Sequence, residues 1–113
     1  MQDTYWKLTH LNGAPVAVGF KQREPHIVLH AKERRLVGSG GCNRIMGSYQ
    51  LEGKKISFGK VAMTKIACPE GMRQEQEFTA TLARVRSWKI TGQHLDLFDE
   101  AKTQVARFQA VAL

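Results

Sequence analysis

Apolar and polar residues alternate along most of the chain, and this pattern predicts short β-strands separated by turns. Residues 5–11 alternate and end at Asn12-Gly13, a dipeptide that favours a hairpin, so residues 16–20 are expected as the return strand. Further strands are expected at residues 26–30, 35–38, 45–51, 55–58 and 61–66, and around Trp88, Ile90, Leu95, Leu97, Val105 and Phe108. The chain is therefore predicted to be mainly β.

One segment departs from this alternation and follows the period of a helix. Phe78, Leu82 and Val85 recur at i, i+4 and i+7, which places them on one face of a helix. Much of the opposite face is expected to carry the polar residues Gln74, Glu75, Gln76, Glu77 and Arg84. The pattern predicts one helix, at about residues 70–86, packed across an antiparallel, barrel-like sheet of α+β type.

Length and composition set the scale of the domain. The 113 residues, of which 42% are hydrophobic and 24% charged, suit a single domain over 1–113 with a core of its own. No apolar run is long enough for a transmembrane helix. Residues 1–6 carry no targeting signal, so the chain is expected to be either cytosolic or the mature part of an exported protein.

The charge balance raises the question of nucleic acid. Seventeen Lys and Arg against ten Asp and Glu give a net charge of +7, and basic domains bind polyanions. Trp6, Phe58 and Trp88, together with Lys54-Lys55, would suit a basic barrel that stacks bases. The charges are dispersed, however, and a strand Trp in a small domain is more often a core anchor. Trp6 and Trp88 are therefore expected in the core with the helix stripe, and nucleic acid is the alternative partner.

A glycine-rich stretch at residues 38–43 admits two interpretations. Backbone N–H groups in such a loop can surround an anion, as in a phosphate cradle. Neither a Gly-Lys-Ser/Thr sequence nor a helix follows directly, however, so no nucleotide fingerprint is met. A tight crossing between strands, with glycine at positive φ, is the favoured interpretation.

Cys42 is the candidate nucleophile of the chain. A thiol enzyme would need a base such as His10, His26, His30 or His94, and the sequence places none of them beside Cys42. The two cysteines and four histidines also lack the spacings of a zinc site. We therefore expect no catalytic residue, no metal and no cofactor, with a Cys42 thiol enzyme as the least favoured alternative.

Taken together, the motifs resemble the META/HslJ-like domain family. The resemblance is carried by Gly41-Cys42-Asn43 followed by Thr64 and Cys68, and it extends from Trp6 through Leu95-Asp96-Leu97 to Phe108. It implies a β-barrel-like domain crossed by a helix. Such domains are common in bacterial envelope proteins, often lipoproteins, with links to heat shock and novobiocin resistance. No enzymatic activity or cofactor is established for the family.

The resemblance turns these observations into a functional expectation. It implies a non-enzymatic envelope or periplasmic domain that binds a protein or a small hydrophobic partner in stress or antibiotic tolerance. The full-length chain would then have a possible lipid anchor. In that oxidising compartment Cys42 and Cys68, the only two cysteines, are expected to lie close together and to form a disulfide. In a cytosolic protein they would instead be two buried thiols.

Overall fold

The computed structural model describes residues 1–16, 24–68 and 71–111, which contain nine strands, one short 3-10 turn and one α-helix. In chain order these are β1 (Tyr5–Leu11), β2 (Ala14–Pro15), β3 (His26–His30), η1 (Lys32–Arg34), β4 (Arg35–Ser39), β5 (Arg44–Glu52), β6 (Lys55–Met63), α1 (Met72–Arg84), β7 (Ser87–Thr91), β8 (His94–Phe98) and β9 (Gln104–Val111). The mainly β class with a single helix is confirmed.

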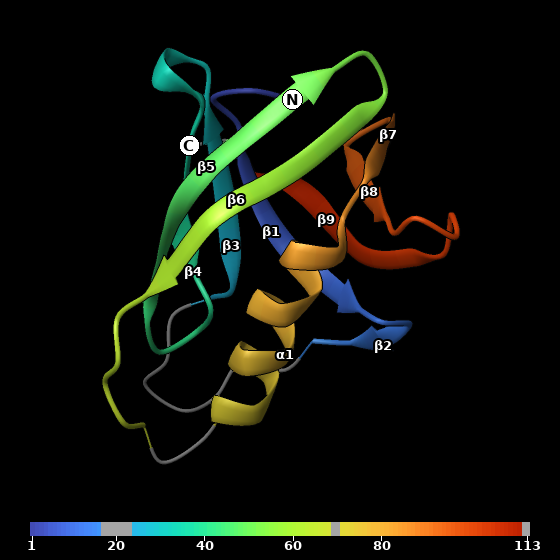
Figure 1. The fold of residues 1–113 in the computed structure, drawn as a ribbon. Coiled ribbons are helices and arrows are strands. Elements are labelled where there is room, and N and C mark those ends of the chain that lie inside the picture. Colours follow the sequence, from blue (N-terminus) through green and yellow to red (C-terminus); the bar gives the residue numbers. More distant parts are fainter. Residues whose placement is uncertain (17–23, 69–70, 112–113) are drawn as a thin grey trace.

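The strands form one antiparallel sheet in the order β2-β1-β3-β4-β5-β6-β7-β8-β9, and β1 also pairs with β9. The hydrogen bonds therefore run around a ring, which gives the sheet its barrel-like shape (Figure 1). The pairing between β6 and β7 is the shortest in the ring, because Lys55 opposite Ser87 is its single matched pair. Beyond that pair the two strands diverge, and α1 packs beside β6.

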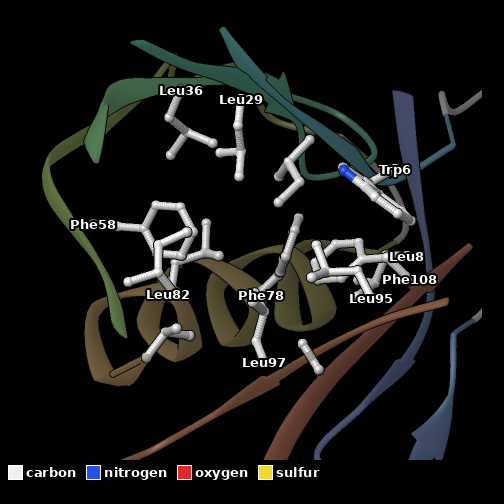
Figure 2. Packing of buried hydrophobic residues seen from close by; sticks show 14 of the residues in the cluster. Trp6, Leu8, Leu29, Leu36, Phe58, Phe78, Leu82, Leu95, Leu97 and Phe108 are labelled. Atoms are coloured by element: carbon white, nitrogen blue, oxygen red, sulfur yellow. The ribbon is translucent and has the colours of Figure 1, made fainter. Parts of the chain in front are cut away.

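The core lies inside the ring and is formed by the alternate residues of the strands that face inward. Trp6 and Leu8 of β1 and Ile27 and Leu29 of β3 are buried, while their neighbours in sequence face outward, as the period of two requires. Figure 2 shows Phe78 and Leu82 pointing from α1 into this core. Full burial of one such side chain stabilises the fold by about 1.5–3 kcal/mol.

The predicted helix stripe belongs to this core. Phe78, Leu82 and Val85 are buried, and the Phe78 ring lies 6.1 Å from the Phe108 ring, centroid to centroid. Trp6 is in the same cluster, whereas Trp88 is only partly buried and packs against its edge. The helix is shorter than the predicted 70–86. It ends at Arg84 because Val85 adopts extended backbone angles, φ −67° and ψ 136°.

One strand prediction needs correction. The strand expected at residues 61–66 contributes only the last three residues of a longer strand, β6, which ends at Met63; residues 64–66 continue as a loop. After β1 the structure has the two-residue β2 at Ala14–Pro15. Of the return strand expected at residues 16–20, Val16 is not in a strand, and residues 17–20 lie outside the described residues. None of the helices described is long and apolar enough to cross a membrane.

Candidate functional site

The glycine-rich loop between β4 and β5 meets two distant parts of the chain. A disulfide joins Cys42 of this loop to Cys68, with 6.3 Å between their Cα atoms. Cys68 belongs to the segment between β6 and α1, so the bond ties this segment to the loop. The structure thereby brings together the motif residues that the sequence singled out.

Glu75, on the first turns of α1, lies at the centre of this arrangement. Its side chain is fully buried, and its carboxylate accepts hydrogen bonds from the backbone N–H groups of Cys42 at 2.9 Å and Asn43 at 2.6 Å. It also accepts one from the Asn43 side-chain amide at 2.7 Å. A buried carboxylate is stable only with such partners, and hydrogen bonds to a charged group are the stronger kind.

Asn43 connects this carboxylate to the segment that carries Cys68. Its Oδ1 accepts hydrogen bonds from the Thr64 hydroxyl at 2.9 Å and the Ile66 backbone N–H at 2.7 Å. Its Nδ2 donates to the Ile66 carbonyl at 3.0 Å as well as to Glu75. The Thr64 hydroxyl in turn accepts from the Arg44 N–H at 3.0 Å. The amide of Asn43 thus uses its full hydrogen-bonding capacity within the protein.

The glycines of the loop fit these roles. Gly41 has φ +116°, a conformation that side chains with a Cβ rarely adopt. At Gly40 a Cβ would collide with the Glu75 side chain. Both interpretations of the loop therefore contain part of the answer: it is a tight crossing, and its N–H groups do surround an anion. That anion is the protein's own Glu75 carboxylate.

The burial of Glu75 corrects its predicted place on the solvent face of the helix. Glu75, Phe78 and Leu82 are spaced i, i+3 and i+7, so Glu75 shares the buried stripe. This spacing was visible in the sequence, but the charge of the side chain argued against burial. We call Glu75, Asn43, Thr64 and the Cys42–Cys68 disulfide the hub.

The hub offers no free nucleophile. Cys42 is in a disulfide, so the thiol required by a thiol enzyme does not exist in this state. Among the candidate bases, His26 stacks on the Tyr5 ring at 4.3 Å between centroids, and His30 contacts Asp3 at 3.3 Å. Within the described parts of the chain, no group of three or more His, Cys, Asp or Glu side chains could hold a metal ion.

A cleft of about 410 Å³ lies beside the hub and is lined by Ser39, Cys42, Asn43, Arg44, Thr64 and Ile66. The Asn43 and Thr64 polar atoms in its wall are already hydrogen-bonded to the protein. Ile66 is 60% exposed, which is unusual for so large an apolar side chain. The cleft therefore presents an apolar contact and the Arg44 side chain, rather than groups arranged for a reaction.

A second surface feature follows from the strand register. Six outward-facing side chains lie directly opposite one another on consecutive strands, and we call them the outer row: Val111, Tyr5, Val28, Val37, Met46 and Ala62. Met46 is 40% exposed and Val111 37%. With strands about 4.8 Å apart, the row runs for roughly 24 Å across the outside of the sheet.

Polar and basic side chains flank the outer row on both sides. Each strand that contributes to the outer row has its next outward-facing position two residues away. On one side of the row these positions include Lys7, His26 and Arg44. On the other side they include His30 and Arg35. The outer row is thus an apolar band between two bands that carry positive charge. Two acidic residues adjoin these bands: the Glu24 carboxylate forms an ion pair with Lys7 at 3.4 Å, and the Asp3 carboxylate lies 3.3 Å from His30.

Tyr5, within the outer row, supplies a prediction about pH. Burial, and then its hydrogen bond and proximity to the Glu24 carboxylate at 2.9 Å, raise the pKa of Tyr5 from 10.0 to about 12. The folded state thus favours the neutral phenol. The stability that the neutral Tyr5 phenol contributes is complete below the pKa that Tyr5 has in the unfolded chain. This contribution is lost as pH rises from about 10 to about 12.

The measurement is a spectrophotometric titration of tyrosinate in the native protein and in Tyr5→Phe. The difference between the two curves isolates Tyr5 from Tyr49 and is expected to have its midpoint near 12. A midpoint near 10.0, the ordinary value, would contradict the observed Tyr5–Glu24 contact.

The aromatic platform considered for nucleic acid does not form as a group. Trp6 is 2% exposed and Phe58 9%, so neither ring can stack on a base. Trp88 alone is partly exposed, and its indole N–H donates to the Gly53 carbonyl at 3.0 Å. The structure therefore gives no support to base stacking on these three residues.

Comparisons with known proteins agree with this fold. The chain matches the family model of the META domain over residues 1–112. An NMR structure of a protein from Burkholderia xenovorans is 26% identical, with a TM-score of 0.77, over 99% of this chain and 84% of that chain. A second NMR structure is 24% identical, with a TM-score of 0.72, over 96% of this chain and 91% of its own.

A more distant likeness is to the crystal structure of a DUF4847 family protein from Bacteroides vulgatus. It is 22% identical, with a TM-score of 0.58, over 75% of this chain and 57% of that chain. At this identity the likeness concerns the fold alone. No curated protein matches the chain significantly.

Proposed function

We propose that this chain, which belongs to the META domain family, is a non-enzymatic binding domain of the bacterial cell envelope. In this proposal it binds a protein or a small hydrophobic partner through the outer row and thereby contributes to stress or antibiotic tolerance. The outer row is the observation that carries the proposal. The physiological setting rests on the resemblance to META/HslJ-like proteins.

The disulfide supports the placement in the envelope. Bonds such as Cys42–Cys68 persist in oxidising compartments, whereas cytosolic thiols are kept reduced. An exported domain of this type would be secreted into the periplasm, or held at a membrane by a lipid anchor in the full-length chain.

The use of polar groups in the hub supports a non-enzymatic role. A catalytic centre needs a nucleophile, acid or base that is free to meet a substrate. Glu75 and Asn43 are instead buried, and they form their hydrogen bonds with the loop and with the segment after β6. The hub therefore acts as a structural centre that holds α1 against the sheet.

The outer row supports partner binding. Single apolar side chains on a surface are ordinary, but a contiguous apolar band bordered by polar residues is typical of an interaction site. Its cross-strand alignment makes it continuous around the outside of the barrel-like sheet, which suits a protein partner or an elongated apolar ligand. Arg35 and Arg44 on its borders would favour a partner with acidic groups around an apolar centre.

The experiment compares two variants of β5 that introduce the same charge. Met46→Lys places a lysine in the outer row, whereas Gln50→Lys places one on an exposed position of the same strand. Each protein is immobilised and exposed to a detergent extract of the host envelope. For a partner that the native protein and Gln50→Lys both retain, the amount bound to Met46→Lys is expected to be at least about tenfold lower. The reason is that burial of a Met side chain in an interface is worth roughly 1.5–3 kcal/mol.

Both substituted side chains are exposed, so the melting temperatures are expected to stay close to that of the native protein. Equal retention of every component by the three proteins would contradict binding through the outer row. Loss of the host's heat or novobiocin tolerance on deletion, restored by Gln50→Lys but not by Met46→Lys, would connect the surface to the physiological role.

A further inference from the structure

A second hollow lies away from the outer row, where the β5–β6 hairpin tip meets β7 and the loop after β8. Its volume is about 240 Å³, and it is lined by Lys54, Ser87, Trp88, Lys89, Phe98 and Lys102. The strand register explains part of this grouping. Ser87 lies directly opposite Phe98, and Lys89 follows two residues along the same face of β7.

Three of the six lining residues are lysines without a counter-charge. In the described part of the chain, Lys54, Lys89 and Lys102 take part in no ion pair. Their charges therefore add up around one small hollow, at the cost of mutual repulsion.

The acidic groups nearby are engaged elsewhere or stand apart. Asp96, opposite Lys89 in the register, lies 3.6 Å from Arg107 and also accepts a hydrogen bond from Gln104. Asp99 accepts the Thr103 backbone N–H at 3.0 Å. Glu100 is exposed and lines a different hollow. A ligand anion would thus meet lysines that form no ion pair with the described residues of the protein.

We propose that this hollow, the lysine pocket, binds a phosphomonoester that carries a small flat or apolar substituent. A phosphomonoester carries a charge of about −1.5 to −2 and three acceptor oxygens. The three ammonium groups equal these oxygens in number, and their combined positive charge is more than enough to balance the phosphate. The Ser87 hydroxyl is a further donor in the wall. No described side chain in the wall is acidic.

The remaining walls and the volume define the substituent. Phe98 and Trp88 are the apolar part of the lining, and an aromatic face suits a flat or apolar group. Pockets for drug-sized ligands measure about 300–1,000 Å³, so the lysine pocket accepts a phosphate with one ring or a short chain. Such a group belongs either to a small soluble phosphate ester or to the head of a lipid such as phosphatidic acid.

Trp88 makes the proposal measurable, because it lines the lysine pocket while the only other tryptophan, Trp6, is buried. The protein is titrated with phenyl phosphate, with phenol, and with phosphatidylcholine vesicles that contain or lack phosphatidic acid, while tryptophan fluorescence is followed. The variant Lys89→Gln/Lys102→Gln is compared with Lys32→Gln/Lys65→Gln. The latter removes the same charge from exposed positions outside the pocket. Trp88→Phe tests the origin of the signal.

We expect a saturable change in tryptophan fluorescence with phenyl phosphate, with phosphatidic acid vesicles, or with both. Binding should weaken as salt is added. The apparent Kd should rise at least about tenfold in Lys89→Gln/Lys102→Gln and stay within about twofold in Lys32→Gln/Lys65→Gln. A response to vesicles alone identifies a lipid head as the source, and a response to phenyl phosphate alone identifies a soluble ester. No response to either, an equal response to phenol, or an equal loss in both variants would overturn the proposal.

Discussion

Replacing Glu75 by Gln is expected to lower the free energy of unfolding by roughly 2–4 kcal/mol. The substitution keeps the shape of the side chain but exchanges one carboxylate oxygen for an NH2 group. That group would face either the two backbone N–H donors at residues 42 and 43 or the Asn43 amide. A buried donor opposite another donor costs its full desolvation, and the stronger bonds to a charged acceptor are also lost.

Urea unfolding followed by circular dichroism measures this loss, and Glu77→Gln is the matched control. Glu77 lies on the same helix, is exposed, and would keep an oxygen to accept the hydrogen bond from Asn12. We expect the control to stay within about 0.5 kcal/mol of the native protein. Equal and small effects of the two substitutions would show that the Glu75 carboxylate does not hold the loop.

Removing the disulfide with Cys42→Ala/Cys68→Ala is expected to cost about 3.5 kcal/mol of stability. This value is the loop-closure entropy for a sequence separation of 26 residues. The same urea measurement on the native protein with and without reductant should give a similar loss, and the reductant should not change the variant. A reductant effect that persists in the variant would assign the loss to something other than this bond.

The hub also predicts how these two changes combine. The disulfide and the Glu75 carboxylate hold the same loop through Cys42, so their removal should not be additive. Urea unfolding of the triple variant is expected to differ from the sum of the separate losses by at least about 0.5 kcal/mol. Additivity would mean that the two contacts act on independent parts of the fold.

Local patterns in the sequence predicted most of the fold because burial follows them closely. The alternation at residues 5–11 and 26–30 matches β1 and β3, and the stripe of Phe78, Leu82 and Val85 faces the core. What local patterns do not contain is the pairing of distant strands. The outer row exists only because Val28, Val37 and Met46 fall opposite one another in register.

The site shows the same division between local and distant information. The loop at residues 40–43 was recognisable from its glycines, and the family resemblance connected it with Thr64 and Cys68. The role of Glu75 was missed because an acidic residue in a helix is usually exposed. Only its hydrogen bonds to a loop 32 residues away make its burial favourable. The lysine pocket also depends on contacts between distant segments, since Lys54 and Lys102 come from different loops.

The redox state of Cys42 and Cys68 in living cells tests most directly the account of a disulfide-bonded envelope domain. Free thiols are blocked with a membrane-permeant alkylating agent in the intact host, and the purified protein is weighed before and after reduction and a second alkylation. A disulfide-bonded envelope domain is expected to carry no adduct before reduction and two adducts after it, one on each cysteine. A protein that already carries both adducts before reduction would contradict the disulfide and the envelope placement together.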